Sequence, residues 1–292
     1  MRDVRVKVLL LGAAGQLGRA LVGPPPQAVE LDARDRSRLD VGDRDAIAQA
    51  IESLTPTVVV NAAAYTAVDK AESDSEPAHR LNAEAPGWIA KACREHGARL
   101  IHVSTDFVFD GRASRPYRPD DPTGPLSVYG ATKLEGERRA LREHADGTAI
   151  IRTAWLYDAT SRNFATTMLR LMRERPLVRV VADQFGTPTA VGGLAHAIWR
   201  AIDRGSTGVL HWTDAGAASW YDFAEAIRRI GQSRGIVPSG VRIEPISTEE
   251  YPTPATRPAF SVLDKASTWQ ALDLAGVHWE DAVAETLGSL SS

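Results

Sequence analysis

An apolar run that ends in three evenly spaced glycines constrains the fold of this chain more than any other feature. Val6–Leu11 leads into Gly12, Gly15 and Gly18 at the start of a helical stretch. In such a unit the first glycine permits a tight turn, the second lets a pyrophosphate approach the backbone, and the third allows close packing of the helix. The pattern predicts a dinucleotide site after the first strand. Its expected contacts are Gly12, Gly15, Gln16, Leu17 and Gly18.

Strand-like and helix-like segments alternate through the first half of the chain. Further strands are expected at 28–33, 57–60, 98–104 and 148–153, and helices at 15–22, 43–54, 77–97 and 127–144. Short connections between strand and helix imply parallel strands with right-handed crossovers. The strands are apolar rather than strictly alternating, as burial on both sheet faces requires. We therefore predict an α/β fold with a Rossmann-like, doubly wound parallel sheet.

The alternation loosens after about residue 155. Helices are expected at 163–174, 191–204 and 220–230, a strand at 208–213, and a Pro- and Thr-rich stretch at 245–258. We predict a dinucleotide-binding Rossmann domain over residues 1–155. Residues 156–292 are predicted to form a smaller C-terminal α/β lobe for the substrate, with some late elements interleaved with the first sheet.

Composition excludes several classes of protein. The 292 residues carry a formal net charge of −3 without a large block of one sign, which argues against a nucleic-acid surface or a membrane patch. No apolar segment is long enough to span a bilayer, and the N-terminus lacks the features of a signal peptide. The single cysteine, Cys93, excludes an internal disulfide and favours a cytoplasmic location. The seven histidines lack zinc spacing, so no metal is predicted.

The end of the second strand carries conflicting signals about the cofactor. Asp32 lies twenty residues after Gly12, where an acidic side chain would bind both hydroxyls of an NAD ribose. Arg34, followed by Arg36 and Arg38, could instead pair with a 2′-phosphate. The arginines favour NADPH, and NADH stays open as an accepted cofactor.

Two further segments are expected beside the dinucleotide. Asp40 and Val41 follow the next turn and could hold the adenine edge. The third strand is followed by small residues, which would let the dinucleotide lie across the strand ends. These residues are Ala62, Ala63, Ala64 and Tyr65.

A tyrosine and a lysine four residues apart open the helix at 127–144. This spacing places Tyr129 and Lys133 on one helix face. A phenol can protonate a ketone oxygen, and a nearby ammonium is expected to lower its pKa. Tyr-x-x-x-Lys alone is a weak signal, but the fourth strand ends in Thr105, whose hydroxyl could orient the same oxygen. The glycine turn, the threonine and the Tyr–Lys pair occur in the order that a ketoreductase requires.

The chain resembles the dTDP-4-dehydrorhamnose reductase family within the extended short-chain dehydrogenases. The resemblance covers nearly the whole chain. The matching segments are NAAAYTAVDKAE at 61–72, STDFVF at 104–109, PLSVYGATKLEGE at 125–137, RTAWLY at 152–157, NF at 163–164, DQFGTPT at 183–189 and YPTPATRP at 251–258.

The resemblance implies a reaction and roles for individual residues. Hydride would pass from the nicotinamide to C4 of a dTDP-linked 4-keto-6-deoxysugar. Tyr129 would supply the proton, Lys133 would tune it and hold the nicotinamide ribose, and Thr105 would orient the ketone. Asn163 and Arg257 would contact the nucleotide end, and Arg257 is the better phosphate ligand chemically. The implied substrate contacts are Thr66, Val68, Thr105, Asp106, Trp155, Asn163 and Arg257.

One departure from the family bears on assembly. Some members dimerise through a magnesium site built from glutamates, one after the third glycine and another after the Gly-x-Pro-Thr segment. Here these stretches read Arg19-Ala20 and Ala190–Gly193, without acids. We therefore expect a monomer, or a weak homodimer without a metal bridge.

Three other functions stay open at this point. Epimerases and 4,6-dehydratases share the scaffold, but Phe107 follows Asp106 where a dehydratase needs a glutamate. A 4-ketoreductase for another dTDP-6-deoxysugar has the same motifs. A non-catalytic regulatory subunit that binds a dinucleotide is opposed by the presence of Thr105, Tyr129 and Lys133.

Overall fold

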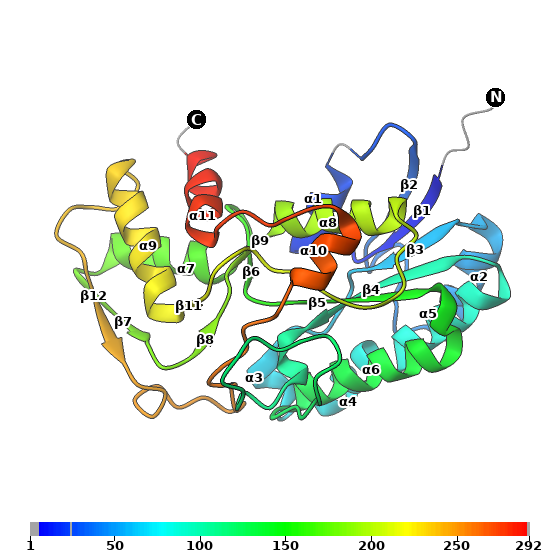
Figure 1. The fold of residues 1–292 in the computed structure, drawn as a ribbon, viewed down its shortest axis with the longest axis horizontal. Helices are drawn as coiled ribbons and strands as arrows, with labels where there is room; N and C mark the ends of the chain where they lie inside the picture. Colours follow the sequence, from blue (N-terminus) through cyan, green and yellow to red (C-terminus); the bar gives the residue numbers. More distant parts are fainter. Residues whose placement is uncertain (1–5, 24, 291–292) are drawn as a thin grey trace.

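A computed structural model describes residues 6–23 and 25–290 of the chain. Its centre is a six-stranded, wholly parallel sheet (Figure 1). The strands are β1 (Val6–Leu11), β2 (Val29–Arg34), β3 (Val58–Asn61), β4 (Arg99–Thr105), β5 (Thr148–Thr153) and β10 (Gly208–His211). All six lie within a few residues of the strands expected from the sequence.

The strand order explains where a ligand can bind. The order is β10-β5-β4-β3-β1-β2, so the chain runs outward from β1 to β2 and then returns across β1 to β3. Ligands of open α/β sheets bind at such a reversal point, beyond the carboxyl ends of the strands. The loops that follow β1 and β3 meet at this point, and they contain the glycine turn and Ala62–Tyr65.

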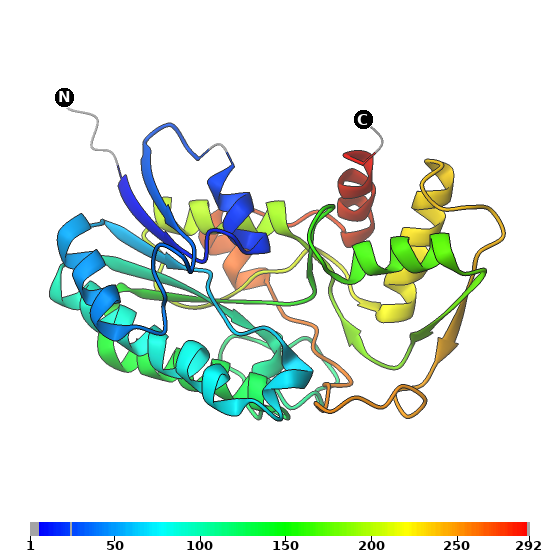
Figure 2. The same cartoon turned by 180° about the vertical axis from the view of Figure 1, so that it is seen from behind.

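Helices cover both faces of the sheet, which confirms the doubly wound fold (Figures 1 and 2). On one face, α1 (Gln16–Val22) and α8 (Val191–Asp203) pack against apolar side chains of β1, β3, β4 and β5. On the other face lie α2 (Arg44–Leu54), α5 (Ala85–Glu95) and α6 (Val128–His144). Asp43 caps α2 through its side chain, and Ser127 caps α6 in the same way.

The helix expected at 77–97 differs from its prediction. It begins earlier and consists of α4 (Ser75–His79), a π-helical turn η1 (Arg80–Glu84) and α5. Pro86 in the first turn of α5 has no N–H for a hydrogen bond to the preceding turn, which favours the wider π geometry. The wide turn contains the buried side chain of Asn82.

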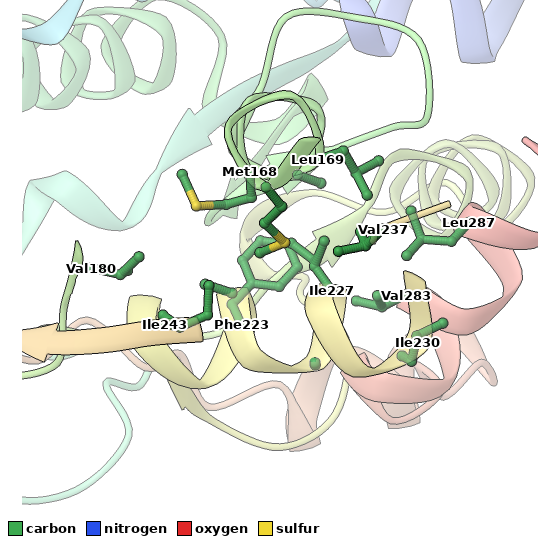
Figure 3. Packing of buried hydrophobic residues seen from close by; sticks show 14 of the residues in the cluster. Met168, Leu169, Val180, Phe223, Ile227, Ile230, Val237, Ile243, Val283 and Leu287 are labelled. Carbon is green, nitrogen blue, oxygen red and sulfur yellow. The ribbon is translucent and has the colours of Figure 1, made fainter. Parts of the chain in front are cut away.

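A second, smaller group of elements follows β5. A parallel pair, β7 (Leu177–Val181) and β12 (Arg242–Ile246), packs with α7 (Phe164–Glu174), α9 (Trp220–Ser233) and α11 (Trp279–Gly288) around its own apolar core. Figure 3 shows Phe223 at the centre of this core, among Met168, Ile227 and Ile243. The sequence predicted α7 and α9 but not β7, β12 or α11. The division of domains at residue 155 stays a prediction.

Several short elements complete the fold. They are α3 (Val68–Ala71), β6 (Leu156–Tyr157), β8 (Phe185–Gly186), β9 (Thr189–Ala190), β11 (Ala218–Ser219), α10 (Ala266–Leu272) and the 3-10 turns η2 (Asp106–Val108) and η3 (Ala145–Gly147). Both β10 and α8 follow the first elements of the smaller group in the chain, but β10 pairs with β5 and α8 packs against the large sheet. Across the described ranges, no helix combines the length and apolar character needed to cross a membrane.

Candidate active site

A deep cleft runs along the carboxyl ends of the central strands and onto the smaller group of elements. Its volume is about 1380 Å³. Sites for one drug-sized ligand usually measure about 300–1,000 Å³, so this cleft has room for two ligands side by side. The predicted site residues that line it are Gly12, Gly15, Gln16, Leu17, Asp40, Val41, Ala62, Ala63, Ala64, Tyr65, Thr66, Val68, Thr105, Asp106, Tyr129, Lys133, Trp155, Asn163 and Arg257.

The glycine turn is shaped by close backbone contacts. Gly12 has a φ of +87°, and a Cβ there would lie 2.8 Å from the backbone nitrogen of Ala63. A Cβ on Gly18 would collide with the carbonyl oxygen of Gly12, so this glycine packs against the turn itself. Gly15 precedes α1, and no side chain caps the helix start. The free backbone N–H groups at the start of α1 therefore lie where a pyrophosphate would fit.

The residues expected at the adenosine ribose bind each other. The guanidinium of Arg34 donates to both carboxylate oxygens of Asp32, at 3.0 and 3.2 Å. This hydrogen-bonded pair holds the pKa of Asp32 below its ordinary value. Neither residue lines the cleft, whereas Asp35 and Arg36 of the next turn do. Arg34 thus neutralises the charge of Asp32.

An asparagine that sequence reasoning missed holds the loop after β3. The side-chain oxygen of Asn82 accepts from the backbone N–H of Tyr65 at 2.8 Å, and its nitrogen donates to the carbonyl of Tyr65 at 3.0 Å. The same nitrogen lies 3.3 Å from the hydroxyl of Thr132 on α6. Asn82 therefore ties the cofactor-side loop to the helix that carries Tyr129. Its only sequence signal is Pro86 shortly downstream in the helix.

Thr105, Tyr129 and Lys133 come together at the carboxyl end of β4. Thr105 ends this strand, and its hydroxyl donates to Asp106 at 3.0 Å. The ring of Phe107 packs edge-on against Tyr129, with 5.6 Å between ring centroids. Tyr129 and Lys133 lie one turn apart on α6, and both line the cleft as the spacing predicted.

The ionisation of Tyr129 differs from the sequence-based expectation. The pKa of the phenol is raised to about 12. Burial is the main cause, a hydrogen bond with Thr105 opposes it, and the charge of Asp106 adds to it. The expected lowering of this pKa by Lys133 is therefore wrong for this structure, because removal of the phenol from water dominates its pKa and Lys133 is not among the groups that shift it. A phenol with this pKa is protonated at neutral pH and can act as an acid.

Lys133 is buried as well. Its ammonium nitrogen donates to the carbonyl of Val103 at 2.6 Å and lies 3.4 Å from Nε2 of His102. Burial lowers the pKa of Lys133 to about 8, although the carboxylate of Glu137 works in the opposite direction. The lysine can therefore change protonation state close to neutral pH.

A buried ion pair joins α6, the helix of Tyr129 and Lys133, to β5. Arg152 on β5 donates to both carboxylate oxygens of Glu137 on α6, the shortest distance being 2.7 Å. Glu137 also accepts a short hydrogen bond from Ser104. Both side chains of the pair are at most 5% exposed. The pair fixes α6 on the sheet, and sequence reasoning did not identify it.

Aromatic side chains line another part of the cleft. The indole of Trp155 stacks on that of Trp220 with 3.5 Å between ring centroids and an interplanar angle of 8°. Trp155 has a φ of +48°, an unfavourable backbone conformation for a bulky residue. A Cβ on Gly186 would lie 2.5 Å from the Trp155 ring, so this glycine makes room for the stack. The sequence identified Trp155 but not Trp220.

Asn163 and Arg257 both line the cleft, but each has partners within the protein. Asn163 caps α7 through a reciprocal pair of hydrogen bonds with Thr166. Arg257 forms a two-pronged ion pair with Asp69 at 2.9 and 3.1 Å. This ion pair joins α3 to the loop at 251–258 across the cleft. No group of three or more metal-ligating side chains occurs in the part of the chain that the structure describes.

Comparison with known proteins identifies the family of this chain. The model of a family described as the RmlD substrate binding domain matches residues 6–292. The dTDP-4-dehydrorhamnose reductase of Burkholderia thailandensis is 42% identical, over 98% of this chain and 100% of that protein. This chain belongs to the dTDP-4-dehydrorhamnose reductase family. The resemblance inferred from the sequence motifs is therefore confirmed.

Two further relatives of this reductase family are informative. A probable dTDP-4,6-dihydroxy-2-methyloxan-3-one 4-ketoreductase of Streptomyces antibioticus is 42% identical, over 95% of this chain and 93% of that protein. A crystal structure of the Bacillus anthracis dTDP-4-dehydrorhamnose reductase, in complex with NADP, superposes with a TM-score of 0.91. The Bacillus anthracis chain is 32% identical in sequence, and the match covers 98% of this chain and 99% of that chain.

The buried ion pair leads to a stability prediction. Arg152→Met leaves Glu137 buried without its counter-charge, so we expect the free energy of unfolding to fall by about 3–5 kcal/mol. Urea denaturation measures this change. The matched control is Arg179→Met, which removes an exposed arginine paired with Glu244 and should cost at most ~1 kcal/mol. Equal costs for the two variants would contradict a structural role for the buried pair.

Proposed function

We propose that the chain is an NADPH-dependent reductase that converts the C4 ketone of dTDP-4-dehydro-L-rhamnose to the alcohol of dTDP-L-rhamnose. The observation that carries this proposal is the convergence of Thr105, Tyr129 and Lys133 on one cleft, beside a glycine turn shaped for a dinucleotide. Family membership supports the substrate class, since the relatives named above are reductases of dTDP-sugars.

Tyr129 is the proton donor in this proposal. Its phenol is protonated at neutral pH because its pKa is about 12. It gives its proton to the ketone oxygen while that oxygen gains negative charge, which is when an acid contributes most. Thr105 orients the same oxygen through its hydroxyl. Lys133, with a pKa of about 8, can replace the proton that the phenol has lost.

NADPH fits the cofactor side of the cleft. The turn from Gly12 to Gly18 and the small residues Ala62–Ala64 would hold the dinucleotide, with Asp40 and Val41 at the adenine and Lys133 at the nicotinamide ribose. When bound, NADPH supplies the hydride. The NADP complex of the Bacillus anthracis relative supports this preference. The pairing of Arg34 with Asp32 supports it independently, and NADH is proposed as a weaker alternative.

The substrate would occupy the side of the cleft formed by the smaller group of elements. Thr66, Val68, Asp106 and Trp155 line the cleft and would contact the sugar. Asn163 and Arg257 would contact the nucleotide end. Arg257 can do so while it keeps one prong of its ion pair with Asp69, because a guanidinium has five N–H donors.

A second candidate differs only in the sugar. The ketoreductase of Streptomyces antibioticus is as similar in sequence as the reductase of Burkholderia thailandensis. A 4-ketoreductase for another dTDP-6-deoxysugar would use the same three catalytic side chains. Turnover of a panel of dTDP-4-keto-6-deoxysugars distinguishes the two candidates by the ratio of kcat/KM values.

Replacement of the phenol tests the catalytic assignment. Tyr129→Phe removes the proton donor and keeps the ring, so kcat should fall by about 100-fold or more. Cofactor binding, measured by quenching of protein fluorescence on addition of NADPH, should change little. An equally active variant would assign the proton to another group. Absence of turnover in the unaltered protein with every keto-sugar would favour a non-catalytic dinucleotide-binding subunit.

The Asp32–Arg34 pair tests the cofactor preference. Arg34→Ala exposes the charge of Asp32 to the 2′-phosphate, so the KM for NADPH should rise by about tenfold and that for NADH much less. Arg179→Ala, an exposed arginine of the smaller group, serves as the control and should change neither. Equal changes in the KM values for NADPH and NADH would show that the Asp32–Arg34 pair does not act at the 2′-phosphate.

The surroundings of Arg19 support a proposal about assembly. Arg19 occupies the place of a family glutamate, and it bonds to Ala14 and Ser161 and lies 3.8 Å from Asp158. We propose a monomer, or a weak homodimer without a metal bridge. Light scattering should give the same mass with magnesium and with EDTA. A dimer that dissociates only in EDTA would contradict this proposal.

A further inference from the structure

Two buried polar side chains, Asn61 and His102, form a row of polar contacts that ends at Lys133. The reaction described above assigns no role to Asn61 or His102. Asn61 ends β3, and His102 is its neighbour in register on β4. Their exposed fractions are 1% and 0%. Buried polar groups need hydrogen-bond partners, so the donors and acceptors along this row are strongly constrained.

The backbone fixes the orientation of the Asn61 amide. The N–H of Ala63 donates to the side-chain oxygen of Asn61 at 3.1 Å. The other end of the amide, its nitrogen, therefore faces Nδ1 of His102, also at 3.1 Å. Because an amide nitrogen can only donate, Nδ1 of His102 must accept.

The imidazole must then carry its proton on the other nitrogen. Burial and the positive charge of Lys133 hold the pKa of His102 well below its ordinary value, so the ring is neutral. A neutral imidazole whose Nδ1 accepts has its hydrogen on Nε2. This N–H faces the side-chain nitrogen of Lys133 at 3.4 Å.

The contact discriminates between the two forms of Lys133. An ammonium group has only N–H donors, so the His102 N–H opposes it, whereas a neutral amine has a lone pair that can accept this N–H. The bond from Lys133 to the carbonyl of Val103 is available to both forms. The row therefore favours the neutral amine.

The other charged and titratable groups around Lys133 do not cancel this effect. Glu137 on α6 favours the ammonium, but Arg152 on β5 neutralises most of its charge. Tyr129 on the same helix is protonated. Asp106 on η2 has a pKa raised to about 6 by burial and acts mainly on Tyr129. The turn η1 contributes the neutral amide of Asn82.

We propose that Asn61 and His102 are positioning residues that direct an imidazole N–H at Lys133 and so make its neutral amine accessible during turnover. The kinetic part of this inference rests on the proposed function. After Tyr129 has protonated the ketone, an N–H bond of the Lys133 ammonium breaks and the O–H bond of Tyr129 re-forms. The neutral amine that results accepts the N–H of His102 until solvent returns a proton.

The direct test is the tautomer of His102, measured by long-range ¹H–¹⁵N correlation spectra of protein labelled with ¹⁵N-histidine. His211 is a matched internal control, because its Nδ1 faces the carbonyl oxygen of Tyr117 at 3.1 Å and must donate. The two buried histidines should therefore show opposite tautomers, Nε2–H for His102 and Nδ1–H for His211. Variants His102→Gln and His211→Gln assign the signals.

A His102 signal with the proton on Nδ1, or an imidazolium at about pH 7, would overturn the inference. This measurement needs no substrate and no turnover, so it is independent of the proposed reaction. If the unaltered protein shows the expected tautomers but reduces no keto-sugar, the hydrogen-bond row is supported and the proposed function fails.

Asn61→Asp tests the consequence for Lys133. A carboxylate has no N–H, so Nδ1 of His102 takes the proton and Nε2 becomes an acceptor that favours the ammonium. The alkaline limb of the kcat profile for reduction, expected near pH 8 in the unaltered enzyme, should move up by about one pH unit. A tautomer that reverses in the spectrum without movement of this limb would overturn the role in catalysis.

Discussion

The packing of α6 onto the carboxyl ends of β4 and β5 is the contact on which the site depends. This helix carries both Tyr129 and Lys133, so a small shift of its axis would move the acid and the amine together. Two polar anchors hold it there, the Glu137–Arg152 ion pair and the bond from Lys133 to Val103. Glycines at 130 and 136 let it lie against Phe107 and Asn82, because a Cβ at either position would collide with their carbonyl oxygens.

The same sheet face changes character along the strands. Toward the amino ends it is apolar, with Val59, Leu100 and Ile150 packed against α2 and α5. Toward the carboxyl ends it becomes polar, with Asn61, His102, Ser104 and Arg152 buried in neighbouring registers. The apolar half stabilises the fold by burial. The polar half specifies one arrangement of hydrogen bonds, and it therefore controls protonation at the site.

Much of this structure could be predicted from the sequence because strong local signals mark it. Most strands of the large sheet are mainly apolar runs, and the observed strand ends lie close to the expected ones. The pair β7–β12 escaped prediction because each strand is short, alternates with exposed charges and has its partner more than sixty residues away. The π turn was missed because its cause, Pro86, also fits the first turn of an ordinary helix.

The site could be predicted only where residue type alone carries the chemistry. Thr105, Tyr129, Lys133 and the glycines belong to this group. The pairing of Arg34 with Asp32, the stack of Trp220 on Trp155 and the row from Asn61 to Lys133 depend on side-chain directions in three dimensions. Burial also reversed the expected effect on the pKa of Tyr129, since the depth of a side chain cannot be judged from helical spacing.

The most direct measurement is a crystal structure of the complex with NADP⁺ and dTDP-L-rhamnose. The account predicts that the phenol oxygen of Tyr129 lies within about 2.6–3.2 Å of the sugar O4, with the nicotinamide C4 facing the sugar C4. A complex with the phenol well beyond hydrogen-bond reach of O4, or with the dinucleotide away from the Gly12–Gly18 turn, would contradict it.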